Sequence, residues 1–456
     1  MTPLAPLALC WLAAPVVLLL DARRPSVSWG AAAVLALATA ADLALMAQMV
    51  WGGREALTVI TGGWPAGVGI RLHVDAVALF FAAVSSTVIL AGMVHERGRR
   101  LRSRSFPGLL LFLAAGLHGA FFTGDLFNFY VFFEVSVVSS FALAAYGYGR
   151  QEARGALIYI AVNLLGSVIF LTGVAVVYHQ AGTIDFVELW RLADDGGRGI
   201  PPLGAALLFT ALALKLGLFP LHYWVPVLYS HAHPAVAAVM SGALINIGAY
   251  GLLRMGLMAA SAPRARAADL LLLLGALTVV YGAVLAANRA RPREIVAYAS
   301  IAQAGYVVLA LGVGGPVGTA AALLAVLAGA LEKAAAFLSL ESAGFARRAS
   351  GLVAAAGIAG LPVTVGFLAK VELFRAVWAT AIGPVLVAAL IVGTLFLFVA
   401  TVRFWERLQT LPRNGPPARG AAAALAALTV LLGALAAPLG ALTVTLGGAL
   451  LEGGGR

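Results

Sequence analysis

The feature that most constrains this chain is a series of apolar runs, each long enough to cross a lipid bilayer. A membrane-spanning helix needs about 20 largely apolar residues, and such windows recur along the whole sequence. Hydrophobic residues make up 62% of the 456 residues and charged residues only 11%, which excludes a soluble domain. We expect an all-α polytopic membrane protein with about 14 transmembrane helices. The predicted spans are 4–20, 28–50, 74–94, 107–123, 126–147, 155–178, 203–220, 234–258, 268–288, 294–313, 317–342, 351–379, 384–404 and 421–450.

Arginines are divided unevenly between the two sets of links that join these spans. Of the 27 arginines, 18 lie in links after odd-numbered spans, 8 lie on the opposite face, and Arg375 lies within a span. Positive charge concentrates on the cytoplasmic side of membrane proteins. The odd-numbered links are therefore predicted to be cytoplasmic, with both termini on the outer face of the cell inner (plasma) membrane.

Lysine follows a different rule from arginine in this sequence. The chain has only three lysines, Lys215, Lys333 and Lys370, and all three fall within hydrophobic segments. Arginine stays charged at any attainable pH, whereas a buried lysine can release its proton. A charge inside a membrane segment is costly and usually marks an ion or proton path. The sequence therefore indicates proton handling.

Two of these lysines stand next to helix-breaking prolines. Lys215 precedes Pro220 in LKLGLFP, and Lys370 follows Pro362 in LPVTVGFLAK. A broken helix frees backbone carbonyls that can hold ions or water. Lysine-bearing breaks in the two halves are typical of an inverted-repeat transporter.

Glu134 is the carboxylate best placed to work with these lysines, because apolar residues flank it for a helical turn or more. Burial and a nearby lysine would pull its protonation in opposite directions, which is how a protonation switch is built. A structural ion pair between Glu134 and Lys215 that pins two helices is the alternative. His222, Asn246 and Glu332 are further candidates for the relay.

Other polar residues receive structural interpretations. Asp125 is expected to be a helix N-cap. His231 and His233, two positions apart in a loop without a third ligand, are weak evidence for a metal site. The single cysteine, Cys10, excludes internal disulfides and multi-cysteine metal or iron–sulfur centres. We expect no metal and no cofactor.

Several function classes lack their sequence signatures. There is no phosphate-binding loop, no dinucleotide fingerprint and no haem ligand set. The net charge of +11 does not indicate nucleic-acid binding, because the arginines lie in short links between apolar runs. Driving force must then come from an ion gradient or from a partner, and whether the chain belongs to an enzyme is left open.

Six ordered stretches resemble one family: the antiporter-like, proton-conducting subunits shared by respiratory complex I, membrane-bound hydrogenases and Mrp-type cation/proton antiporters. The resemblance is closest to the D-type subunit of Mrp antiporters, while HAHPAV is closer to the hydrogenase-linked relatives. The stretches are GGWPAGVGIRLHVDAVALFF (62–81), DLFNFYVFFEVSVVSSFAL (125–143), LIYIAVNLLGSVIFLTGVAVVY (157–178), LKLGLFPLHYWVP (214–226), AYASIAQAGYVVLALG (297–312) and GIAGLPVTVGFLAKVELFRA (357–376).

This resemblance implies a fold and a site. The fold has fourteen helices with two inverted five-helix repeats, each containing a broken helix. The chain would divide into N-terminal helices (1–106), a first repeat (107–260), a second repeat (261–405), and a cytoplasmic link with a C-terminal helix (406–456). Glu134 and Lys215 would be the coupled pair of the first half, with Lys333 and Lys370 in the second.

The chain departs from the family pattern at two positions. Relatives usually carry a connecting lysine where this chain has Asn246, and a histidine just before Lys333 where this chain has Glu332.

The leading hypothesis is a proton-translocating subunit of a multisubunit monovalent cation/proton antiporter. Its partners would be other membrane subunits, protons, and sodium or another monovalent cation. The alternatives are a pumping module of a redox complex, or a non-conducting scaffold suggested by Asn246.

Overall fold

The protein is described by a computed structural model that covers residues 3–64, 69–99, 101–146, 149–194, 199–258, 261–412 and 420–453. Within the predicted cytoplasmic link and C-terminal helix (406–456), residues 413–419 and the last three residues of the chain lie outside the described residues. The elements are α1 (Ala5–Leu19), α2 (Pro25–Trp51), β1 (Leu57–Ile60), the 3₁₀ turn η1 (Thr61–Gly63), β2 (Arg71–Val74), α3 (Ala76–Arg99), α4 (Phe106–Phe122), α5 (Leu126–Ala144), α6 (Arg150–Ala181), α7 (Phe186–Asp194), α8 (Pro202–Leu216), α9 (Trp224–His231), α10 (Pro234–Val239), the π turn η2 (Met240–Leu244), α11 (Asn246–Met258), α12 (Ser261–Ala287), α13 (Pro292–Val313), α14 (Gly315–Ser339), α15 (Gly344–Ala359), α16 (Val365–Trp378), α17 (Gly383–Thr410), α18 (Ala421–Ala434) and α19 (Ala436–Gly453).

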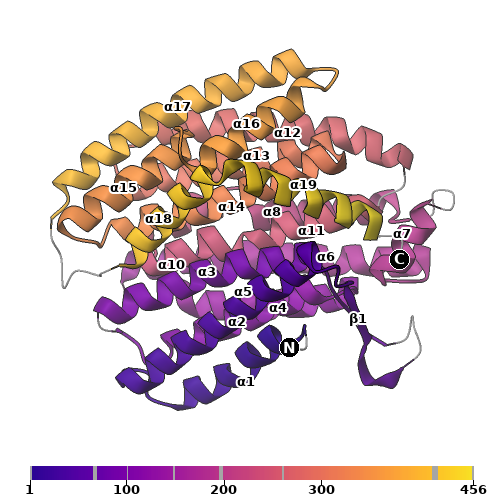
Figure 1. Cartoon of the computed structure of the whole chain (residues 1–456), viewed down its shortest axis with the longest axis horizontal. Helices are drawn as coiled ribbons and strands as arrows, with labels where there is room; N and C mark the ends of the chain where they lie inside the picture. The colour runs from indigo at the N-terminus through magenta and orange to yellow at the C-terminus, as the bar shows by residue number, and fades with distance from the viewer. Residues whose placement is uncertain are drawn as a thin grey trace.

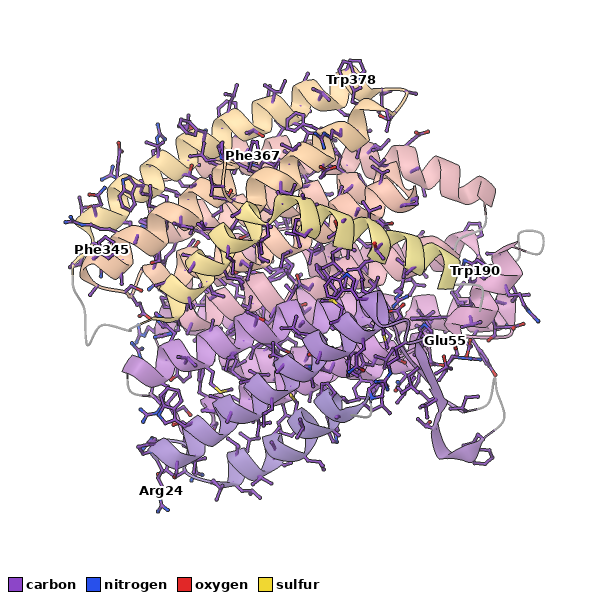
Figure 2. All side chains as sticks on the ribbon, viewed as in Figure 1. Arg24, Glu55, Trp190, Phe345, Phe367 and Trp378 are labelled. Carbon is purple, nitrogen blue, oxygen red and sulfur yellow. The ribbon has the colours of Figure 1, made fainter. Side chains whose placement is uncertain are left out.

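The helices form a bundle whose long axes run roughly side by side (Figure 1). The N-terminal helices α1 to α3 lie along one side and α15 to α17 along the other, with α18 and α19 crossing in front. Figure 2 shows Arg24 and Phe345 toward one end of the bundle, and Glu55 and Trp190 toward the opposite end. The two labelled residues from links after odd-numbered predicted spans, Arg24 and Phe345, thus lie apart from the two from links after even-numbered spans, Glu55 and Trp190.

The bundle confirms a polytopic helical membrane protein. Among the described residues, nine helices are long and apolar enough to cross a membrane, and the count is ten if α18 and α19, bent by 86°, form one span. Three shorter apolar helices, α1, α4 and α8, accompany them. The predicted run 351–379 is two helices, α15 and α16, separated at Pro362.

Glycines bring α12 and α13 into backbone contact. A Cβ added to Gly275 would lie 2.6 Å from the backbone nitrogen of Leu309, and one added to Gly305 would lie 2.6 Å from that of Val279. Small residues let membrane helices approach closely where lipid supplies no hydrophobic drive for association. This glycine seam holds the backbones of α12 and α13 in direct contact.

A small antiparallel hairpin, β1 with β2, projects from the end of the bundle that carries Glu55 (Figure 1). Two ion pairs fasten this region: Arg71 Nε lies 2.6 Å from Asp185 Oδ2, and Arg254 Nη2 lies 2.6 Å from Asp75 Oδ1. Burial alone would raise the pKa of Asp75, but the charges of Arg254 and His73 hold it below its ordinary value. The carboxylate is therefore charged at neutral pH and anchors the start of α3.

We predict that Gly275→Leu destabilises the protein by about 3 kcal/mol, because a side chain cannot enter a seam closed by backbone atoms. The measurement is the thermal unfolding midpoint in mild detergent. Gly30→Leu in α2 is the matched control, since a Cβ there meets nothing within 4 Å. Equal midpoints for the two variants would contradict the role given to the seam.

Candidate functional site

The first lysine lies at the end of a helix that stops inside the bundle. Gly217 ends α8 in the left-handed region (φ 73°), and the N–H groups of Gly217 and Leu218 bond back to Leu214 and Ala213. This is a Schellman motif, which glycine permits without strain. The break thus begins at Gly217, ahead of Pro220. Trp224 Nε1 donates to the carbonyl of Leu214 at 2.8 Å.

The second break repeats this construction. Gly360 ends α15 with φ 79°, and its N–H and that of Leu361 bond back to Gly357 and Ala356. Here the lysine comes from the following helix, α16: Lys370 Nζ donates to the carbonyls of Ile358 and Ala359, both at 2.8 Å. Figure 2 shows Phe367, near the start of α16, away from both ends of the bundle.

A serine joins the first lysine to the predicted carboxylate. Lys215 Nζ lies 3.3 Å from Ser167 Oγ, and that hydroxyl donates to Glu134 Oε1. The ammonium also lies 4.8 Å from the ring centre of Phe133. Among the described residues no direct ion pair within 4.0 Å joins Glu134 to Lys215, so the pair is coupled through a hydroxyl instead. A hydroxyl can accept a proton on one side and donate on the other.

Lys333 and Asn246 share a small cavity at the centre of the bundle. Both side chains are buried, and with Gln303 they line a space of about 20 Å³, the size of one water molecule. Asn246 Nδ2 also donates to Ser85 Oγ at 3.1 Å and to the carbonyl of Gly242 at 3.0 Å. Asn246 begins α11, one residue beyond the end of the π turn η2 at Leu244, and such distortions are often found at functional sites.

A second cavity of about 20 Å³ lies between Glu332 and Lys370. Glu332 is buried against Gly357 and Gly366. A Cβ atom on either glycine would collide with the Glu332 carboxylate, so the two glycines leave the space that it occupies. Lys370 lines this cavity together with Glu332, whereas Lys333, the sequence neighbour of Glu332, does not, as expected because adjacent helix positions point in different directions.

Gln303 on α13 connects the two cavities, because it lines both of them. Its Nε2 lies 3.4 Å from Glu332 Oε2. The predicted second-half residues Lys333, Glu332 and Lys370 are thus brought together around one amide.

The remaining predictions have different outcomes. Asp125 is the N-cap of α5, accepting from the N–H of Asn128 at 2.7 Å, which confirms the expected cap. His222 is not on a continued helix with Lys215; it lies in the turn after the break, 3.0 Å from Tyr281 OH on α12. It therefore bridges the two halves of the chain.

Two residues of this arrangement, Ser167 and Gln303, were missed by the sequence-based prediction. Both are uncharged and common in membrane helices, so neither carries a signal comparable to a buried lysine. A helical offset of four from Asn163 to Ser167 could have indicated a polar stripe on α6.

Comparison with known proteins decides the family. The family described as NADH:quinone oxidoreductase/Mrp antiporter, TM, matches residues 123–352. The chain belongs to this family. It is 29% identical over 414 residues to the D-type subunit of the Na⁺/H⁺ antiporter of Alkalihalophilus pseudofirmus, covering 83% of each chain. It is 32% identical over 431 residues to the N-type subunit of the NADH-quinone oxidoreductase of Desulforudis audaxviator, covering 86% of this chain and 82% of the relative.

Solved structures share the fold across nearly the whole chain. A chain of the Mrp complex from Dietzia sp. superposes with a TM-score of 0.86 at 24% identity, covering 99% of this chain and 98% of that one. A chain of the archaeal membrane-bound sulfane sulfur reductase superposes with a TM-score of 0.88 at 24% identity, covering 98% of this chain and 97% of that one. The family fold thus extends beyond the matched residues 123–352.

We predict that Ser167→Ala slows proton movement about tenfold while leaving the protein folded, because it removes the hydroxyl between Glu134 and Lys215. The measurement is proton flux in reconstituted vesicles. Thr172→Ala is the matched control: its hydroxyl also bonds back four residues along α6, to Val168, but at an exposed position. Equal flux in both variants would show that Ser167 plays no part.

Proposed function

We propose that this chain is the proton-translocating subunit of a multisubunit monovalent cation/proton antiporter. The observation that carries the proposal is a pair of polar groups inside the bundle. Half-buried Glu134 and buried Lys215 are joined by the hydroxyl of Ser167. Buried Lys333, Glu332 and Lys370 surround the amide of Gln303 and two water-sized cavities. Similarity to the D-type subunits of Na⁺/H⁺ antiporters supports it. Its partners are other membrane subunits, and the exchanged ion is sodium or another monovalent cation.

The proposal includes a finer architecture. The chain forms fourteen spans with two inverted five-helix repeats, bounded at 107–260 and 261–405 between the N-terminal helices (1–106) and the C-terminal part (406–456). The matching breaks at Gly217 and Gly360 support the repeats. The arginine bias supports cytoplasmic odd-numbered links and both termini facing outward, in the plasma membrane.

In the proposed mechanism, protons move between side chains and water molecules, and the chain carries out no covalent catalysis. A proton that leaves the Lys215 ammonium passes to Ser167, whose own proton goes to the Glu134 carboxylate. In the second half a water in each small cavity would link Lys333 to Gln303, and Gln303 to Glu332 and Lys370. Asn246 holds the central water where other chains of the family would place a charge.

We predict that Lys215→Ala and Glu134→Gln each reduce ion-gradient-dependent transport at least tenfold. Glu134→Gln keeps the size of the side chain and an acceptor for Ser167 but cannot exchange a proton. The measurement is cation-driven proton flux, with protein in the membrane quantified in parallel. Wild-type flux in Glu134→Gln would assign Glu134 a packing role only and refute the relay.

A redox-complex module is the second candidate, favoured by the 32% identity to an N-type subunit of an NADH-quinone oxidoreductase. The two candidates differ in their partners. We expect the tagged protein, extracted from its native membrane in mild detergent, to carry small hydrophobic subunits and no redox protein. Co-purifying iron–sulfur or hydrogenase subunits would favour the redox module, and the chain emerging alone would contradict both assemblies.

A further inference from the structure

Outside the relay, four ionisable side chains from distant parts of the sequence meet at one point. His95 and Glu96 lie in the last turns of α3, His233 precedes α10, and Glu341 follows α14. We call these four residues the histidine–carboxylate cluster. The side chains of His95, Glu96 and His233 are almost fully buried, while that of Glu341 is 13% exposed.

The spacing within the cluster is too long for ordinary hydrogen bonds. His95 Nε2 lies 3.4 Å from Glu341 Oε2, and His233 Nε2 lies 3.6 Å from both Glu96 Oε2 and Glu341 Oε1. Hydrogen bonds of this type are about 2.7–3.2 Å long. Four ligands that hold one tetrahedral ion at about 2.0–2.1 Å lie about 3.3–3.4 Å apart. The observed separations match ligands around a shared ion better than they match direct bonds.

Three of the four residues are already gathered as a ligand set. Glu96, His233 and Glu341 offer ligand atoms that all lie within 4.8 Å of one another. His95 joins them through the second oxygen of Glu341. An ion at this point would therefore need only small side-chain movements to acquire a fourth ligand.

The two histidines have no other use for their ring nitrogens. Neither nitrogen of His95 nor of His233 has a hydrogen-bond partner among the described residues. A buried polar group without a partner costs about 1–3 kcal/mol, and two imidazoles would incur that cost twice. A neutral imidazole nitrogen is the commonest metal ligand in proteins.

The surroundings resemble the outer shell of a metal site. Tyr146 OH donates to Glu96 Oε1 at 2.8 Å, which turns the other oxygen toward His233. The ring of Tyr146 packs edge-on against that of His233 at 5.5 Å. Partners of this kind orient ligating carboxylates and imidazoles. A cavity of about 290 Å³, lined by Glu341, Arg293 and Arg347 among others, borders the cluster at Glu341.

We propose that His95, Glu96, His233 and Glu341 bind one first-row divalent transition-metal ion of the zinc type. Two imidazoles and two carboxylates suit Zn²⁺, Co²⁺ or Ni²⁺, whereas Ca²⁺ and Mg²⁺ prefer oxygen ligands alone. The two carboxylates balance the charge of the ion. Arg102 and Arg293 lie close enough to influence His233 electrostatically, so arginine–carboxylate pairing is the competing arrangement.

The ligands come from separate elements and not from the HAH sequence alone. His231 is not part of the cluster, since its Nδ1 lies 2.8 Å from the carbonyl of Val227. The partners of His233 come instead from α3 and from the segment after α14. An ion there would tie α3 to α14, the helix that carries Glu332 and Lys333. The site is independent of the proposed transport function.

The test is metal binding to the full chain, purified in detergent without a polyhistidine tag and stripped with a chelator. We expect one Zn²⁺ per chain with micromolar or tighter affinity, a rise in unfolding temperature on adding Zn²⁺, and the strong visible absorption of tetrahedral Co²⁺. The variants are His95→Gln and Glu341→Gln, each expected to weaken binding at least tenfold. His231→Gln is the matched control and should bind as the wild type does.

Absence of stoichiometric Zn²⁺ binding by the folded wild-type chain would overturn the proposal and leave arginine–carboxylate pairing in its place. Binding that survives in His95→Gln and Glu341→Gln, or that is lost in His231→Gln, would also overturn it. If a variant fails to fold, the Co²⁺ spectrum of the wild type still decides, since tetrahedral coordination requires ligands of this number and kind.

Discussion

The structure depends on one constraint: backbone N–H and C=O groups inside a membrane must find partners within the protein. Both helix breaks meet this demand in the same way. A left-handed glycine, Gly217 or Gly360, turns the chain so that the last N–H groups bond back, and a donor side chain reaches a freed carbonyl. Trp224 is that donor at the first break and Lys370 at the second. The breaks are therefore closed structures that can persist at membrane depth.

This solution also accounts for where the ionisable groups lie. Lys370 is held by two carbonyls that a continuous helix would have used itself, so the break supplies the solvation that lipid cannot. Lys215 receives a serine hydroxyl and the carbonyl of Asn163. The helix α14 carries Glu332 and Lys333. Its most apolar stretch, long enough to cross a membrane, is fully buried inside the protein. Glu332 and Lys333 thus lie on a helix that is wholly enclosed by the rest of the bundle.

Much of this could be predicted from the sequence, because apolar runs and isolated lysines are strong local signals. Each of the fourteen predicted runs contains helix, and the unusual environment of Lys215 and Lys370 was expected from the nearby prolines.

The short hairpin β1–β2 was missed, since its strands have no apolar alternation of useful length. The serine that lies between Glu134 and Lys215 was also missed, because it carries no charge signal. What could not be predicted depends on packing between distant segments. Gln303 gains its position only once α13 lies against α14 and α16, and His233 meets its carboxylates only when α3 and α14 converge.

The size of the two cavities around Gln303 has a consequence for energy conservation. Each has room for about one water, and an amide that cannot take up charge stands between them. A continuous file of water across the bundle would short-circuit any gradient that the membrane maintains. Two separate cavities of this size do not form such a file. Water must enter them and the side chains between them must rearrange before each proton transfer. In a proton-moving protein, the separation of these two cavities would limit proton leak at rest.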